Sequence, residues 1–198
     1  VDRTTDGTGY VQEYTLNELK QLFIAGDDEI HRIPTLRETF ELLAPYCKGK
    51  GLHLNIELKN SEIRYEGMEQ RVIDMVSEYN IEDYVVYSSF NHDSIGLVRQ
   101  LKCDADAAYL AGDYHRCMDG ISKYGGMTIH PAQWGMPINK GDVETIRNAG
   151  LCVRMRNGSE PLYGQLRTLP DMDLREYYRL GATDIFTNVP ERYCENRR

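Results

Sequence analysis

The segment from residue 52 to residue 59, LHLNIELK, alternates polar and apolar side chains. Because successive side chains of a strand point to opposite faces, Glu57 and Lys59 share one face with His53 and Asn55, and the apolar residues share the other. Burying a carboxylate and an ammonium group costs several kcal/mol unless they pair or bind a ligand. The pattern therefore predicts a catalytic or binding site around Glu57 and Lys59.

The surroundings of this strand decide between two interpretations. In a closed parallel barrel, the apolar face packs against helices and the polar face points inward. Active sites of such barrels lie at the carboxyl ends of the strands, where Glu57 and Lys59 fall. The alternative is an edge strand with one face in water. We favour the barrel, because its other strands would surround this one.

Two arginines follow the same alternation in LCVRMR at residues 151–156, which directs Arg154 and Arg156 toward the same site. Arginine suits a phosphate because its planar guanidinium group can donate two parallel hydrogen bonds to phosphate oxygens. A pair of solvated loop arginines is the alternative. For Arg156 neither interpretation is preferred.

Other side chains at predicted strand ends could line a pocket. His130 ends one strand facing inward, and we expect it to line the site rather than to catalyse. Phe90 closes another strand and could form a pocket wall, although core packing explains it equally well. Trp134 is either a lid or a surface contact. No serine lies in a nucleophile elbow, so a Ser-His-Asp hydrolase is excluded.

Short strands alternating with amphipathic helices must position these residues, and this alternation indicates a parallel sheet. Two helices come first, at 16–23, with a capping box of Thr15 and Glu18, and at 36–46. The predicted strands are 51–58, 84–89, 107–110, 127–130, 151–155 and 184–188. Later helices are predicted at 68–79, 115–124 and 173–180. Two more are predicted, one that is capped by Asn91 or Asp93 and runs through residue 101, and one that ends at residues 149–150.

This rhythm predicts an α/β fold, an incomplete parallel (β/α) TIM-type barrel in a single domain over residues 1–198. An eight-unit barrel takes about 250 residues, so six of eight strands are expected here. An open doubly wound sheet is the alternative. It is weakened because no glycine-rich phosphate loop follows any predicted strand.

Composition indicates which classes of partner are disfavoured and in which cellular compartment the protein is expected. The net charge of −8 disfavours nucleic acid as a partner, since its phosphates need a basic face. No apolar run approaches the length of a membrane span. The five cysteines are odd in number and widely spaced without a CxxC pair, which predicts free thiols and a cytoplasmic location.

Five segments resemble, in the same order, motifs of the glycerophosphodiester phosphodiesterase family. They are DRTTDGTG at 2–9 (LDRTTNGTG in the family), IPTL at 33–36 (IPTLEE), NIELK at 55–59 (NIEIK), SSFN at 88–91 (SSFN) and GATDIFTN at 181–188 (GADGIITN). Each motif alone is weak, but five in one order are specific.

The resemblance implies a barrel enzyme of lipid metabolism that hydrolyses glycerophosphodiesters to glycerol 3-phosphate and an alcohol. It implies a divalent cation, Mg²⁺ or Ca²⁺, with Glu57 as one ligand. It makes Lys59 a cation that stabilises the phosphate, and Phe90 a pocket residue. A small-molecule glycerophosphodiester is the implied partner, with no nucleic acid and no membrane span.

The departures from the family pattern concern the catalytic machinery. The family's His-Arg pair, its other metal-binding acids and its second histidine precede the DRTT segment, so we expect them before Val1 and expect the chain alone to be inactive. Arg156 and Asn157 stand where the family has Trp-Thr, and His130, on a different strand, does not replace a missing histidine. The alternatives are a non-catalytic partial barrel that binds an anionic ligand or a protein, and a phospholipase of related fold.

An incomplete barrel has an open side. We expect the first and last strands of this chain to lack outer neighbours and to favour self-association, because unpaired backbone groups recruit further strands. The residues expected nearest the opening are Leu54, Ile56, Ile185 and Thr187.

Overall fold

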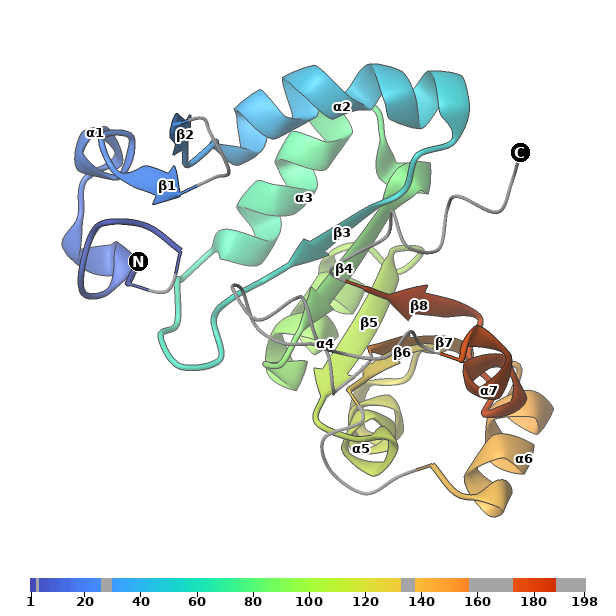
Figure 1. Ribbon diagram of the computed structural model, residues 1–198. Helices are drawn as coiled ribbons and strands as arrows, with labels where there is room; N and C mark the ends of the chain where they lie inside the picture. The colour runs from blue at the N-terminus through green and yellow to red at the C-terminus, as the bar shows by residue number, and fades with distance from the viewer. Residues whose placement is uncertain (3, 26–29, 133–137, 157–172, 188–198) are drawn as a thin grey trace. The chain divides into compact units, whose positions relative to one another are not determined.

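The computed structural model describes residues 1–2, 4–25, 30–132, 138–156 and 173–187 (Figure 1). The chain divides into two compact units, Val1–Leu52 and His53–Arg198, and each is described by itself. No helix in the described ranges is long and apolar enough to cross a membrane. The four cysteines that can be placed, Cys47, Cys103, Cys117 and Cys152, are free thiols.

The first unit joins short elements to one long helix. Its elements are the 3-10 turn η1 (Val11–Glu13), α1 (Leu16–Leu19), the antiparallel strands β1 (Phe23–Ala25) and β2 (Ile30–Arg32), and α2 (Leu36–Lys50). Both helices begin at a Thr-x-x-Glu capping box. Thr15 and Glu18 form the first box, as the sequence predicts.

Three predicted boundaries in and next to this unit are wrong: the ends of the helices expected over 16–23 and 36–46, and the start of the strand expected from Gly51. The helix expected over 16–23 ends at Leu19, because Phe23 instead pairs with Arg32 of β2 and exchanges hydrogen bonds with Asp6. The strand expected from Gly51 begins at Leu54, because α2 continues to Lys50 and Gly51 ends it in the left-handed conformation (φ 67°) that glycine adopts without strain.

The second unit is a parallel sheet whose strands alternate with helices. Its elements are β3 (Leu54–Glu57), α3 (Met68–Glu78), the 3-10 turn η2 (Glu82–Tyr84), β4 (Val85–Ser89), α4 (His92–Leu101), β5 (Asp106–Ala111), α5 (Tyr114–Tyr124), β6 (Thr128–Pro131), α6 (Lys140–Ala149), β7 (Cys152–Arg156), α7 (Leu174–Arg179) and β8 (Asp184–Phe186).

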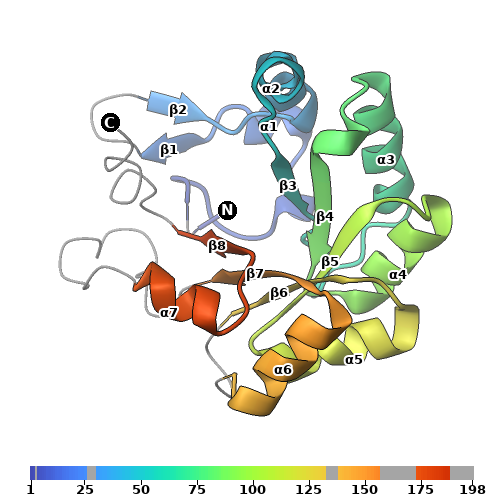
Figure 2. The same ribbon diagram turned by 90° about the vertical axis from the view of Figure 1, so that its right-hand side faces the viewer.

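The strand order is β3-β4-β5-β6-β7-β8, all parallel and in chain order. The sheet curls, with α3, α4, α5 and α6 on its outer face (Figure 2). The prediction of an incomplete parallel α/β barrel is therefore confirmed, and the open doubly wound sheet is excluded by this strand order.

Alternation along the strands separates an outer core from an inner polar face. The outer set packs under the helices and is buried, as Tyr87, Tyr109, Ile129 and Val153 show. Tyr109 lies against Gly120 of α5, and its hydroxyl donates to the Gly125 carbonyl oxygen at 2.7 Å. These contacts join β5 to α5 on the outer face of the sheet.

β3 lies at one end of this strand order and pairs with β4 alone among the described strands. Five strands follow it in the sheet on one side, and its other edge has no strand partner among the described residues, as expected for the first strand of an incomplete barrel. The side chain of Asn55 is accordingly exposed, and that of Glu57 is only partly buried.

Candidate functional site

Glu57 and Lys59 form an ion pair at the carboxyl end of β3. Glu57 is the last residue of the strand, and its Oε1 lies 2.6 Å from the Nζ of Lys59. The Lys59 side chain is 69% exposed and the Glu57 side chain 28%, so both can be reached by a ligand. The two side chains thus lie together, on the edge of the sheet where parallel barrels place their active sites.

Ser88 of β4 lies beside Glu57 on the same face. The two residues are in register, and paired residues of parallel strands share a face. Ser88 is fully buried, and its hydroxyl has no hydrogen-bond partner among the described residues. Sequence reasoning missed Ser88, because only the register of β3 against β4 sets it next to Glu57.

Arg154 of β7 lies within a cluster of acidic groups on the inner face. Its Nη2 is 3.0 Å from Oδ2 of Asp106, and its Nε is 3.5 Å from Oδ2 of Asp184. Thr128 donates a further hydrogen bond to Asp106 at 2.7 Å. Since both aspartates begin their strands, the guanidinium group is held toward the amino ends of β5 and β8. Its charge is matched by carboxylates, which sequence reasoning did not anticipate.

His130 of β6 is 1% exposed and lies between Arg154 and Phe186. Its Nε2 is 3.3 Å from Nη1 of Arg154, and its ring meets that of Phe186 edge-on with centroids 5.0 Å apart. Burial, and next the nearby charge of Arg154, lowers the pKa of His130 to about 3. The imidazole is thus uncharged at neutral pH and a weak base, which suits a lining role better than proton transfer.

The remaining predicted residues fall at strand ends. Phe90 follows β4 directly and is 42% exposed, which argues against core packing as its explanation. Arg156 is the last residue of β7, in register with Phe186, and its side chain is half-buried. Trp134 and Asn157 lie outside the described residues.

A divalent cation needs more oxygen ligands than this edge supplies. Mg²⁺ and Ca²⁺ take about six or more oxygens. Within the described ranges no group of three or more His, Cys, Asp or Glu side chains could hold a metal ion. Glu57 fits as one ligand, and the described residues do not by themselves complete a donor set.

The fold and this edge define a protein of the parallel (β/α) barrel class with a Glu–Lys ion pair at the carboxyl end of one of its strands. Residues 1–123 match the model of the glycerophosphoryl diester phosphodiesterase family. The chain is 31% identical over 209 residues to a glycerophosphodiester phosphodiesterase of Bacillus altitudinis, covering 100% of this chain and 77% of that protein. The chain belongs to the glycerophosphoryl diester phosphodiesterase family.

Solved structures share the fold. A putative glycerophosphodiester phosphodiesterase from Galdieria sulphuraria superposes with a TM-score of 0.74 at 24% identity, over 96% of this chain and 74% of that one. An Oleispira antarctica phosphodiesterase, solved in complex with the product sn-glycerol-3-phosphate, gives a TM-score of 0.67 at 24% identity, over 97% of this chain and 74% of that one.

Proposed function

We propose that the protein containing this chain hydrolyses glycerophosphodiesters to glycerol 3-phosphate and an alcohol. Family membership and the relative from Bacillus altitudinis support the reaction class. The observation that carries the proposal is the Glu57–Lys59 pair, 2.6 Å apart at the carboxyl end of β3. Hydrolysis breaks one phosphorus–oxygen bond of the diester and adds water across it.

Lys59 supplies positive charge where negative charge develops on the phosphoryl oxygens. Its ammonium group is exposed enough to leave Glu57 and face a substrate phosphate. Such charge stabilisation is commonly the largest contribution to catalysis of this kind. Lys59 is therefore the catalytic residue that we assign within the described part of the chain.

Glu57 is proposed as one ligand of a divalent cation, Mg²⁺ or Ca²⁺, whose other ligands come from outside the described residues. When bound, such an ion neutralises charge on the phosphate. For the isolated chain we expect no tight Mg²⁺ or Ca²⁺ binding by calorimetry, because one carboxylate is too few. Micromolar binding that disappears in Glu57→Gln would contradict this.

The neighbouring residues are proposed to contact substrate. Phe90 is an exposed aromatic wall beside the strand ends, and His130 lines the inner face. Of the two arginines, we assign the phosphate contact to Arg156 rather than Arg154, because Arg154 is already paired with Asp106 and Asp184.

The test is steady-state hydrolysis of a glycerophosphodiester by the full-length protein. Glu57→Gln and Lys59→Met should each lower kcat by about 10²-fold or more. Glu62→Gln, an exposed carboxylate in the loop after β3, is the matched control and should leave turnover unchanged. Near-normal turnover of Glu57→Gln would remove Glu57 from the site. Phosphate binding without hydrolysis in the unmodified protein would favour the non-catalytic alternative.

A further inference from the structure

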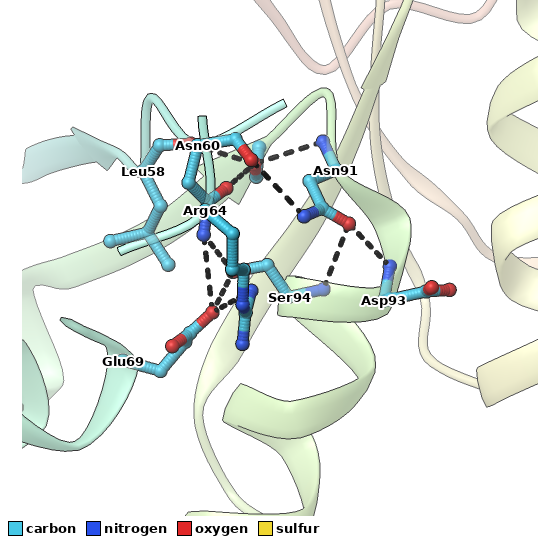
Figure 3. A network of polar contacts seen from close by, with 8 residues as sticks. Leu58, Asn60, Arg64, Glu69, Asn91, Asp93 and Ser94 are labelled. Carbon is cyan, nitrogen blue, oxygen red and sulfur yellow. Dashed lines mark hydrogen bonds and ion pairs between the residues drawn. The ribbon is translucent and has the colours of Figure 1, made fainter. Parts of the chain in front are cut away.

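Glu69, in the first turn of α3, is a carboxylate with no solvent exposure. One oxygen, Oε1, accepts hydrogen bonds from Ser94 Oγ and from Asn60 Nδ2 at 3.2 Å, and pairs with Arg64 Nη1 at 2.6 Å (Figure 3). The other, Oε2, has no partner among the described residues. An apolar side chain would fill this position without the desolvation cost of a buried charge.

The Glu69 carboxylate is nevertheless ionised at neutral pH. Burial alone would raise its pKa, but the hydrogen bond from Ser94, a hydrogen bond from the backbone, and the charge and hydrogen bond of Arg64 together outweigh burial, so the pKa of Glu69 lies below its usual value. A carboxylate in this state only accepts hydrogen bonds. The Glu69 carboxylate therefore requires the NH₂ side of the Asn60 amide, and not its oxygen, to face it.

Asn60 uses every polar atom of its side chain, and it is 2% exposed. Its Nδ2 donates to Glu69 and, at 2.9 Å, to Ser94 Oγ, while its Oδ1 lies 3.2 Å from Ser89 Oγ. The carbonyl oxygen of Asn60 accepts from Asn91 Nδ2 at 3.3 Å. The residue after Lys59 is thus bound to α3, to the end of β4 and to the start of α4.

The residue before Lys59 is held as firmly. Leu58 is 3% exposed, its N–H donates to the Ser88 carbonyl oxygen at 2.7 Å, and its own carbonyl oxygen accepts from Ser89 Oγ at 2.7 Å. Lys59 therefore projects a 69% exposed side chain from a backbone fixed on both sides.

We propose that Glu69, through Asn60 and Ser94, is a positioning residue that fixes the backbone from which Lys59 projects beside Glu57. The role rests on the proposed function and goes beyond it, since Glu69 lies outside the strand that carries the pair. The buried negative charge keeps Asn60 in one amide orientation, and that orientation ties the end of β3 to α3 and α4. Small displacements matter here, because a shift of about 1 Å at a catalytic group can cost about 10²-fold in rate.

The experiment exchanges donor and acceptor within the network of the full-length protein. Asn60→Asp is isosteric, but it sets a second carboxylate against Glu69, and kcat should fall by about 10²-fold with little change in KM. Adding Glu69→Gln supplies an amide donor that faces the carboxylate introduced at position 60, and most of the kcat should return in the double variant. Val153→Ala, a core truncation in β7, is the control for lost stability alone.

Hydrogen exchange of the 198-residue chain tests positioning without substrate. Asn60→Asp should speed exchange at the amides of Leu58, Asn60 and Asn91 relative to those of β7, and the double variant should restore it. If Asn60→Asp fails to fold, Ser94→Ala removes one hydroxyl and should show the same pattern more weakly.

The outcomes separate the two proposals. If Asn60→Asp lowers kcat no more than Val153→Ala at matched thermal stability, Glu69 has no positioning role, although the function stands while Glu57→Gln remains inactive. If Glu57→Gln turns over normally, the proposed site fails whatever Glu69 does.

Discussion

His130 illustrates, at the scale of one residue, how burial removes a side chain from its solution chemistry. Its pKa of about 3 in the folded chain compares with about 6.5 in an unfolded one. Between these values the unfolded state binds the proton and the folded state does not. The free energy of unfolding should therefore fall by about 1.4 kcal/mol for each pH unit as pH drops from about 6.5 toward 3.

Urea unfolding of the chain at several pH values between about 7.5 and about 4 would measure this dependence. His130→Gln should flatten the acid limb even if it lowers stability at neutral pH. His53→Gln, at an exposed histidine, is the control for replacing an imidazole by an amide. The charged groups that face the His130 ring are Arg154 and Asp106. If the free energy of unfolding of His130→Gln depends on pH as steeply as that of the unsubstituted chain, groups other than His130 determine the acid sensitivity.

Individual residues also show what the alternation of polar and apolar side chains along a strand can and cannot predict. Glu57 and Lys59 were predictable, because the two-residue period of a strand determines which side chains share a face. Asp106, Asp184 and Glu69 were not, since each meets its partner from another strand or helix. A carboxylate in a helical turn, such as Glu69, looks in the sequence like any solvated helix residue. Only the packing of α3 against α4 brings it to Ser94.

At the scale of secondary-structure elements, the parallel strands were predictable from the alternation of strands and helices along the sequence. The β1–β2 pair was not predictable. Strands β3 to β8 alternate with amphipathic helices, so their number and direction follow from pattern. β1 and β2 are three residues each, too short for periodicity to separate from a helix end. Their pairing depends on contacts such as Asp6 with Phe23.

The packing of α5 on β5 depends on a glycine. A methyl group on Gly120 would overlap the ring of Tyr109, a fully buried side chain that cannot swing away. Gly120→Ala should therefore destabilise the chain by about 1–3 kcal/mol. Thermal unfolding measures the effect.

Gly49, in α2, provides the matched control, because a methyl group there would meet nothing within 4 Å. Gly49→Ala should stabilise by about 0.5–1 kcal/mol through helix propensity alone. Equal effects at the two glycines would show that Tyr109 tolerates displacement and that this packing is looser than the structure indicates.

At the scale of the whole molecule, the strand order leaves β3 and β8 each with one strand partner in the described part of the chain. Leu54, Ile56, Ile185 and Thr187 lie half-buried along these edges. Unpaired strand edges recruit further strands, and water does not remove the cost of partly exposed apolar surface. We therefore expect the 198-residue chain to self-associate, or to retain a separate peptide along the opening.

A proline at β3 would test whether the strand edge is responsible. The Leu58 N–H points to Ser88 on β4, so along the strand the N–H groups of Asn55 and Glu57 point away from β4. Asn55→Pro removes one of these outward donors, leaves the ladder with β4 intact, and should shift the chain toward monomer. Sedimentation velocity at low micromolar concentration measures the assembly state of the unsubstituted chain and of Asn55→Pro. Mass spectrometry detects any co-purifying peptide. A compact monomer without a bound peptide in the unsubstituted chain would contradict self-association, and association unchanged by Asn55→Pro would place the contact away from the β3 edge.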